Sequence, residues 1–231
     1  MNAKEHALSV FPQESCGIVV DDKYIPCENI AENPLLDFRI DDKITLPFIA
    51  NGTLQKVIHS HPVKQILAKS SPSSSDMRGQ ISSNVPWGII DTDGEVVNDP
   101  YFWGDFKLDE ELYGVEFHHG VQDCYTAVRK WYWQMLNIKL ADIPRDDEWW
   151  VNGEDLYTEN FDKWGFIKIS PSDIKHGDVM LGKVLSARLN HAGVFVEGGL
   201  VYHHLPGRLS RREPASNWIN RADLILRYNA N

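Results

Sequence analysis

The stretch DCYTAVRKWYWQML, residues 123–136, decides the fold of the second half of the chain. Its apolar residues recur at spacings of three and four, which predicts an amphipathic helix with one buried face. Asp123 stands where an N-cap residue belongs, so we expect Cys124 to begin the helix. The apolar positions of the predicted buried face are Val128, Trp131, Tyr132, Met135 and Leu136.

Three short strand candidates follow this helix: DVMLG at 178–182, HAGVFVEG at 191–198 and LVYHH at 200–204. Gly198-Gly199 is typical of a tight turn, so the last two strands are expected to form a hairpin. A helix followed by short antiparallel strands is typical of an α+β domain. The two ends of such a hairpin lie side by side, which predicts that His191 contacts His203.

The first half of the chain has a mixed α/β pattern. Its serine-rich stretch between Ile66 and Ser83 is interpreted as a flexible loop. The segment Asn98–Leu112 breaks the periodicity, so we expect two domains, at residues 1–100 and 113–231. The elements expected before that segment are a helix over Lys4–Phe11 and strands at Gly17–Val20, Gln55–His61 and Trp87–Asp91.

Composition limits the function classes. The chain has 231 residues, with 23 Lys and Arg against 33 Asp and Glu, a formal net charge of −10. An acidic chain neutralises phosphates poorly, so no nucleic-acid partner is expected. No apolar run approaches the roughly 20 residues of a membrane helix, and the first 15 residues show no secretory signal. Three cysteines, Cys16, Cys27 and Cys124, are too few for a disulfide scaffold and fit synthesis in a reducing cytoplasm.

A metal site is suggested by HSHP at residues 59–62. Residues i and i+2 of a strand face the same side, so His59 and His61 can bind one ion. A catalytic zinc commonly takes three protein ligands, and Asp76 is the nearest downstream carboxylate candidate. Glu14, just before a buried-looking strand, is a candidate base for taking a proton from water. The alternatives are an incidental histidine pair, a solvated turn around Asp76 and a surface charge at Glu14.

The order PQESCG, HSHP and PSSSD resembles the JAMM (JAB/MPN) metalloprotease motif, whose members have a mixed α/β fold around a zinc ion. The interval between His61 and Ser73 is several residues longer than this family usually has, which leaves Ser71 and Ser74 as alternatives to Ser73. The resemblance implies that the zinc ligands are His59, His61 and Asp76. It also implies that Glu14 is the general acid/base and that Ser73 supports the tetrahedral intermediate.

Cys124 is a candidate nucleophile. The partial positive charge at a helix N-terminus stabilises a thiolate, which predicts a lowered pKa for this thiol. A nucleophilic cysteine also needs a nearby base and a third group that orients it. His191 is the candidate base, with His203 or His204 as the third group. The alternative role for a lone cysteine is that of a small buried hydrophobic residue.

The stretches GVQDCYTAVRKWY and NHAGVFVEGGLVYHH resemble the NlpC/P60 family of papain-like cysteine peptidases, many of which cut cell-wall peptides. The family often has an upstream tyrosine that donates a hydrogen bond near the oxyanion. Phe117 stands at that point here and cannot donate, which leaves a backbone N–H at the helix start. The resemblance implies a nucleophile, a base, an orienting residue and the acid that precedes the nucleophile: Cys124, His191, His203 and Asp123.

A JAMM-like half followed by an NlpC/P60-like half resembles the tail-tip assembly proteins of lambda-like bacteriophages. This resemblance implies a zinc cofactor, a peptidoglycan peptide substrate and other tail-tip proteins as partners. It also implies synthesis in the host cytoplasm and a place in the virion tail tip or a tail assembly intermediate. One alternative is a structural tail-tip component with one or both hydrolase sites inactive. Another is a peptidase that acts on a host protein.

Overall fold

The computed structural model describes residues 1–66 and 69–229. The chain divides into two compact units, Met1–Phe106 and Lys107–Asn231. Within the described residues, no helix is both long enough and apolar enough to cross a membrane.

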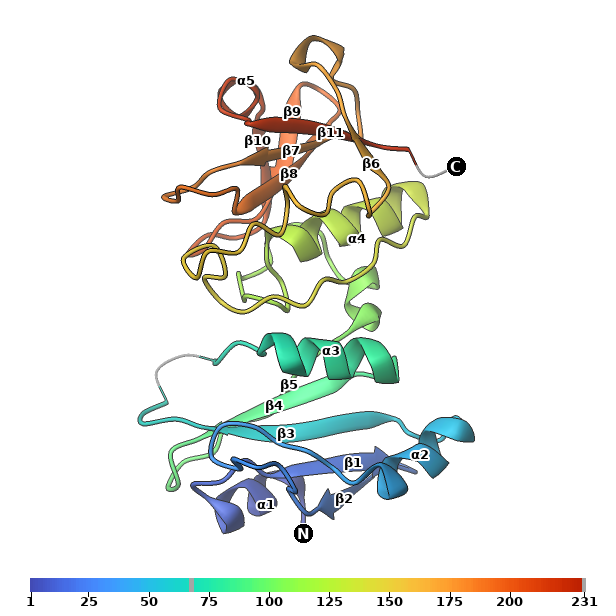
Figure 1. Ribbon diagram of the computed structural model, residues 1–231, viewed down its shortest axis with the longest axis vertical. Coiled ribbons are helices and arrows are strands. Elements are labelled where there is room, and N and C mark those ends of the chain that lie inside the picture. The colour runs from blue at the N-terminus through green and yellow to red at the C-terminus, as the bar shows by residue number, and fades with distance from the viewer. Residues whose placement is uncertain (67–68, 230–231) are drawn as a thin grey trace. The chain divides into compact units, whose positions relative to one another are not determined.

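The first unit is built on a five-stranded sheet with strand order β2-β1-β3-β4-β5. Its elements in chain order are α1 (Ala3–Val10), β1 (Cys16–Val20), β2 (Lys23–Cys27), α2 (Asp42–Ala50), β3 (Lys56–Pro62), α3 (Ser74–Ser83), β4 (Trp87–Thr92) and β5 (Tyr101–Trp103). Strands β3 and β4 run parallel, and the other pairs are antiparallel. A parallel pair needs a crossover, which α3 supplies. Figure 1 shows α3 on one side of this sheet and α1 on the other.

The central strands of this sheet carry continuous apolar runs. Every residue of β1 and of β4 is buried, as expected for strands covered on both faces. The strands expected at 17–20, 55–61 and 87–91 are confirmed to within a residue at each end. The first unit therefore has the mixed α/β structure that its sequence pattern predicts.

The serine-rich stretch is not a simple loop, and this expectation was wrong for residues 74–83. Ser73 is the N-cap of α3: its side chain accepts from the backbone N–H of Asp76, and Asp76 accepts from the backbone of Ser73. This reciprocal pair is a capping box, which starts a helix even where the composition is polar. Residues 67–68 of the stretch lie outside the described residues. The segment 98–112 also differs from the expected linker, because β5 pairs with β4 and the division falls after Phe106.

The second unit is built on a six-stranded antiparallel sheet with strand order β10-β9-β8-β7-β11-β6. The expected helix and three strands are present, and β6, β10 and β11 were not anticipated. Its helices and strands in chain order are α4 (Cys124–Leu136), β6 (Phe166–Lys168), β7 (Val179–Gly182), β8 (His191–Val196), β9 (Leu200–His203), β10 (Arg211–Pro214), α5 (Ser216–Ile219) and β11 (Leu224–Tyr228).

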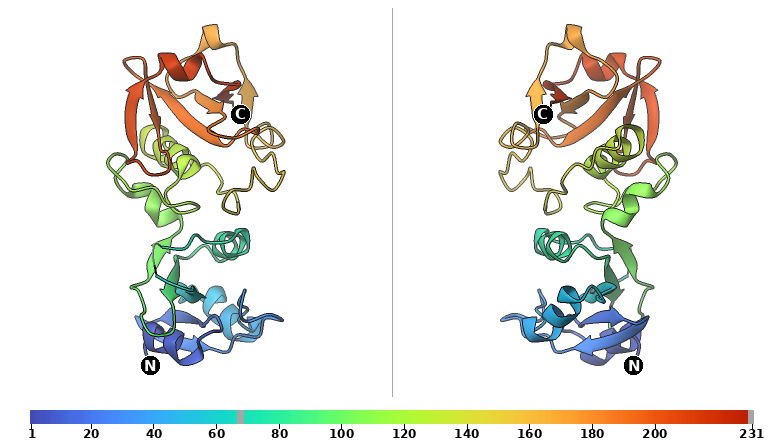
Figure 2. Two further views of the ribbon diagram at one scale, coloured as in Figure 1. Left: turned by 90° about the vertical axis from the view of Figure 1, so that its left-hand side faces the viewer. Right: turned by 90° about the vertical axis from the view of Figure 1, so that its right-hand side faces the viewer.

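Helix α4 covers one face of this sheet and α5 the other (Figures 1 and 2). Val128 and Trp131 of α4 pack with Ala192 and Val194 of β8 in the main core. Side chains alternate along a strand, so His191 at the start of β8 points away from that core. On the α5 side a smaller cluster forms: Met180, Val201, Ala215 and Ile225, with Trp218 and Ile219 packed against it.

The last turn of α4 departs from the predicted apolar face. Met135 and Leu136 are 52% and 42% exposed, whereas Trp131 and Tyr132 are buried. The helix ends at Leu136, and Asn137 follows in the left-handed conformation that closes it. The periodicity therefore predicted the helix correctly, and only its final turn lies outside the core.

Candidate functional site

The side chains of His59 and His61 project from the same face of β3. The Nε2 atoms of His59 and His61 lie 3.0 Å apart. Two nitrogen ligands at about 2.0–2.1 Å from one tetrahedral ion are roughly 3.3 Å apart. The observed separation is therefore close to what a shared ion requires. Neutral imidazole is the form that binds a metal, and burial lowers the pKa of His59, which keeps its ring neutral.

Asp76 reaches the histidine pair from the first turn of α3. Its Oδ1 lies 3.3 Å from His59 Nε2, and its Oδ2 lies 3.7 Å from His61 Nε2. Ser73 Oγ donates to Asp76 Oδ2 at 2.7 Å, so the capping box also orients the carboxylate. Burial disfavours the charged form, but His59 and then His61 outweigh it and hold the pKa of Asp76 well below its usual range. The structure thus brings together all three side chains predicted as metal ligands.

Glu14 lies at the same cluster, just before β1. One ligand atom from each of Glu14, His59 and His61 falls within 4.8 Å of the other two. The backbone N–H of Ser15 donates to Ser60 Oγ, which ties this segment to β3 between the histidines. Burial raises the pKa of Glu14 to about 7, with His61 opposing the rise. A carboxyl with this pKa exchanges protons readily at neutral pH, which suits a general base, and its position also suits a ligand.

Contacts that the sequence did not reveal fix the rings of these histidines. Phe38 stacks on His59 with ring centroids 4.4 Å apart. On the other histidine, His61 Nδ1 lies 2.9 Å from Ser70 Oγ, which in turn donates to Asp91. Ligand histidines in metal sites have such outer partners, which set ring orientation. No local motif links Phe38 or Asp91 to HSHP, so only the fold shows them.

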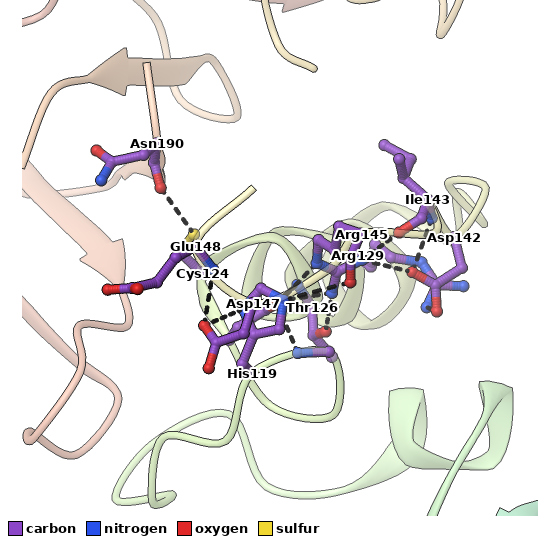
Figure 3. A network of polar contacts seen from close by, with 12 residues as sticks. His119, Cys124, Thr126, Arg129, Asp142, Ile143, Arg145, Asp147, Glu148 and Asn190 are labelled. Atoms are coloured by element: carbon purple, nitrogen blue, oxygen red, sulfur yellow. Dashed lines mark hydrogen bonds and ion pairs between the residues drawn. The ribbon is translucent and has the colours of Figure 1, made fainter. Parts of the chain in front are cut away.

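The second constellation lies at the start of α4. Cys124 Sγ is 3.8 Å from the backbone oxygen of Asn190 (Figure 3). The backbone N–H of Ala192 also bonds to the sulfur. The sulfur therefore lies against the backbone on both sides of His191. Over residues 1–66 and 69–229, its hydrogen bonds run to Asn190, Ala192 and Tyr157, and none joins it to an imidazole ring.

The expected low pKa of Cys124 was wrong for this structure. Burial, and then the neighbouring Asp123 carboxylate, raise the pKa of the thiol to about 11. The Tyr157 hydroxyl and the Ala192 N–H act in the opposite direction but do not outweigh them. The helix N-terminus therefore does not by itself produce a thiolate, because Asp123 caps that same terminus. The thiol is protonated at neutral pH and needs a base.

His191 and His203 make the predicted contact, with His191 Nε2 3.1 Å from His203 Nδ1. Gly193, rather than His191, pairs directly with His203 across the ladder. The two rings are thus diagonal neighbours on one face of the hairpin. His204 points elsewhere: its ring packs against Phe117, with centroids 5.2 Å apart. The geometry therefore favours His203 over His204 as the neighbour of His191.

Both histidines of this pair are neutral at pH 7. Burial, and then His203 and His204, lower the pKa of His191 to about 3. Burial also lowers the pKa of His203, although Glu213 opposes it. A neutral imidazole is the form that a general base needs.

We expect the second unit to lose stability as pH falls below about 6.5. Unfolded His191 titrates near 6.5 but folded His191 only near 3, so the unfolded chain binds more protons between these values. The free energy of unfolding should therefore fall by up to about 1.4 kcal/mol per pH unit from this residue. Urea unfolding of the parent and of His191→Gln at several pH values measures the effect. Equal slopes in the two proteins would contradict it.

Asp123 belongs to a buried ionic network that sequence reasoning missed. Arg145 donates to both of its oxygens, at 2.8 and 3.0 Å, and to Asp142 Oδ1 at 3.1 Å. Arg129 binds the other oxygen of Asp142 at 2.9 Å. Figure 3 shows Arg145 between α4 and Asp142. The network fixes residues 142–145 against the helix turn that carries Cys124.

Replacing Arg145 by methionine should destabilise the second unit by about 3–5 kcal/mol, because it leaves the buried Asp123 carboxylate without its partner. Urea unfolding measures this loss. Asp123→Asn should lower the free energy of unfolding less in the Arg145→Met variant than in the parent, because the two residues are coupled. Arg188→Met is the matched control: the Arg188 side chain is only partly buried and lies 3.8 Å from Asp155, so its loss should change stability by no more than about 0.5 kcal/mol. Equal effects of the two arginine variants would contradict the role of the network.

Tyr157 is a second residue that the sequence did not reveal. Its hydroxyl lies 3.6 Å from Cys124 Sγ, and its ring packs against Trp149 in the core. It comes from the long connection between α4 and β6, which has no recognisable motif. Phe117, at the position where the family often has tyrosine, packs on His204 instead. A phenol donor is thus present beside the sulfur, from another part of the chain.

Comparison with known proteins matches the second unit to a known family. Residues 98–227, more than half of the chain, match the model of the NlpC/P60 family. The chain belongs to the NlpC/P60 family. The matched range contains Cys124, His191 and His203, so all three lie in the family's domain.

Two phage proteins are similar over most of their length. The chain is 33% identical over 180 residues to tail tip assembly protein K of Escherichia phage lambda, covering 78% of this chain and 84% of that protein. It is 30% identical over 233 residues to tail tip assembly protein K of Escherichia phage N15, covering 96% of this chain and 91% of that protein.

Among solved structures, the NlpC/p60 domain of the peptidoglycan hydrolase SagA is 20% identical with a TM-score of 0.35, covering 50% of this chain and 89% of that one. An NlpC/P60 family protein from Bacillus cereus is 10% identical with a TM-score of 0.37, covering 100% of this chain and 68% of that one. The family assignment rests on the match over residues 98–227.

Proposed function

We propose that the second unit of this NlpC/P60 protein is a cysteine endopeptidase that cuts peptide bonds in peptidoglycan. One observation carries the proposal: the Cys124 sulfur lies against the backbone flanking His191, whose ring is held by His203 at 3.1 Å. The proposed nucleophile thus lies beside the backbone of the proposed base, and the ring of that base contacts the proposed orienting group. The family match over residues 98–227 supports the same chemistry.

The proposed reaction starts from a neutral thiol and a neutral imidazole. His191 takes the Cys124 proton as the sulfur attacks the peptide carbonyl carbon, giving a tetrahedral oxyanion. The Tyr157 phenol and backbone N–H groups at the start of α4 are the donors that can stabilise this charge. His191 then gives the proton to the leaving amine, and a thioester forms on Cys124. Water attacks the thioester, releasing the acid and restoring the thiol.

The similarity to two tail tip assembly proteins supports a place for this protein in a phage tail. We therefore place it in tail-tip assembly, made in the host cytoplasm and associated with other tail proteins. Such a protein meets the host wall from outside, where local cleavage of wall peptides would open a path. The virion tail tip or an assembly intermediate is the proposed location.

For the first unit we propose a zinc-dependent amide or isopeptide hydrolase. The supporting observation is the cluster of His59, His61 and Asp76, whose donor types and separations fit a zinc ion. Bound zinc would supply a Lewis acid that polarises a carbonyl and makes water more acidic. Glu14 is the group beside this cluster that would accept a proton from water, and Ser73 orients Asp76.

A second candidate function is that of a structural tail-tip component with inactive sites. The specific observation in its favour is the raised pKa of Cys124 together with the lack, in residues 1–66 and 69–229, of a hydrogen bond from its sulfur to a ring. A digestion experiment separates the two functions. The purified chain is incubated with muropeptides and with a panel of folded proteins, and new termini are identified by mass spectrometry.

New peptide termini in the muropeptides alone support the wall peptidase. New termini only in the folded proteins would favour a peptidase directed at host proteins. No new termini in either would favour the structural function.

A further inference from the structure

The far side of His203 carries a carboxylate that the proposed reaction does not use. Glu213, on β10, places its Oε1 3.2 Å from His203 Nε2. Strand β10 pairs with β9 so that Glu213 lies opposite Val201, two residues along from His203 and on the same face. The buried His203 Nε2 has no hydrogen bond of standard geometry in the described chain, so it lies unpaired beside this carboxylate. Glu213 is therefore the acceptor within reach of that nitrogen.

Glu213 is itself held in place by two donors. Trp218 Nε1 donates to Oε1 at 2.7 Å, and Arg211 donates to Oε2 at 2.9 Å. The Trp218 ring also covers both histidines, with centroids 4.5 Å from His203 and 5.0 Å from His191. Among the residues that the structure describes, the side-chain contacts printed for the Glu213 carboxylate are to groups that can donate, so the carboxylate acts as an acceptor.

The position of Glu213 determines which ring nitrogens of His203 and His191 carry a proton. A neutral imidazole has one N–H and one bare nitrogen. If His203 Nε2–H donates to Glu213, its Nδ1 is bare and must accept from His191 Nε2–H. The Nδ1 of His191 is then bare, which is the state that can take the proton of Cys124. With the opposite tautomers, His191 would carry its proton on Nδ1 and could not act as a base.

We propose that Glu213 is a positioning residue that fixes the tautomers of His203 and His191, so that His191 keeps a bare Nδ1 for Cys124. The sequence showed no sign of this role, because Glu213 lies in the charged run RRE and ten residues beyond His203. The inference rests on the proposed function only for its effect on rate. The tautomers themselves belong to the resting protein.

The groups that face His203 come from three elements and from the residue that follows it. They are His191 on β8, Arg211 and Glu213 on β10, Trp218 on α5, and His204, which directly follows β9. Arg211 and His204 disfavour the imidazolium form of His203, and Glu213 favours it. Removal of the Glu213 charge should therefore move the acidic limb of a pH–rate profile toward lower pH.

The test uses the full chain labelled with ¹⁵N in its histidines. Long-range ¹H–¹⁵N spectra assign the ring nitrogens, with His191→Gln and His203→Gln identifying the signals. In the parent we expect a proton on Nε2 and a bare Nδ1 in both rings. Glu213→Ala should mix or reverse these tautomers. Glu213→Gln should keep them, because its amide oxygen can accept from His203 and Trp218.

The kinetic arm uses muropeptides and the same variants. Glu213→Ala should lower kcat about ten- to a hundred-fold with little change in KM, and shift the acidic limb to lower pH. Glu213→Gln should retain most of kcat but show the same shift. Glu197→Ala, at the exposed turn between β8 and β9, is the matched control and should change neither.

The spectra decide the proposal even if the parent cleaves no muropeptide, so a failure of the proposed function is recognised separately. A bare Nε2 on His203 in the parent, or unchanged tautomers in Glu213→Ala, would overturn the proposal. So would a Glu213→Ala enzyme with the parent's kcat and pH profile.

Discussion

Replacing Cys124 by alanine is expected to lower the rate of peptide release from peptidoglycan by at least about 1,000-fold. The reason is that alanine has no atom that can attack the carbonyl, so the thioester route is closed. The oxyanion donors that remain can supply only a small residual rate. Release of peptides from purified sacculi, followed by liquid chromatography and mass spectrometry, measures the loss.

Cys124 is partly exposed. The fold should survive this change, because alanine is smaller than cysteine and fits in the same space. Thermal unfolding within a few degrees of the parent would show this. Cys27→Ala is the matched control, since it also removes one thiol but lies in the first unit. Equal digestion by the parent and by Cys124→Ala would remove Cys124 from the mechanism.

Replacing both His59 and His61 by alanine is expected to reduce bound zinc from about one ion per chain to almost none. Two of three proposed protein ligands are lost, and Asp76 alone is too weak a site for zinc. Metal analysis of protein dialysed against dilute zinc measures the change. Zinc at about 100 times its dissociation constant should also stabilise the parent by about 2.7 kcal/mol against unfolding, and not the variant.

The control for this experiment removes two histidines elsewhere. His118 and His176 both belong to the second unit and neither is part of the cluster, so their double alanine variant should bind zinc like the parent. A parent chain that binds no zinc at neutral pH would end the metal hypothesis for the first unit. The cysteine site would be unaffected, because none of its residues belongs to the cluster.

Local sequence patterns predicted much of the second unit. The spacing of Val128, Trp131 and Tyr132 predicted α4, and Gly198-Gly199 predicted the hairpin that brings His191 to His203. Both are short-range features, in which neighbours along the chain determine the geometry. The pKa of Cys124 was not predictable in this way. It depends on burial and on Asp123 together, and the helix N-terminus pointed in the opposite direction.

Contacts between distant segments account for what could not be predicted. Arg145, Tyr157 and Glu213 each reach the second site from 10 to more than 30 residues away, and none lies in a pattern with a fixed partner. The same applies to Phe38 against His59 in the first unit. Residues in recognisable motifs were thus found from the sequence, whereas the residues that orient them required the fold.

The most direct test of the account is the mass of the chain during turnover. Parent protein digesting muropeptides is quenched with acid and its cysteine-containing peptides are analysed. We expect an acyl group derived from the substrate as a thioester on Cys124, with Cys16 and Cys27 unmodified. Peptide release by a chain that carries no such adduct, at a rate that Cys124→Ala also reaches, would contradict it.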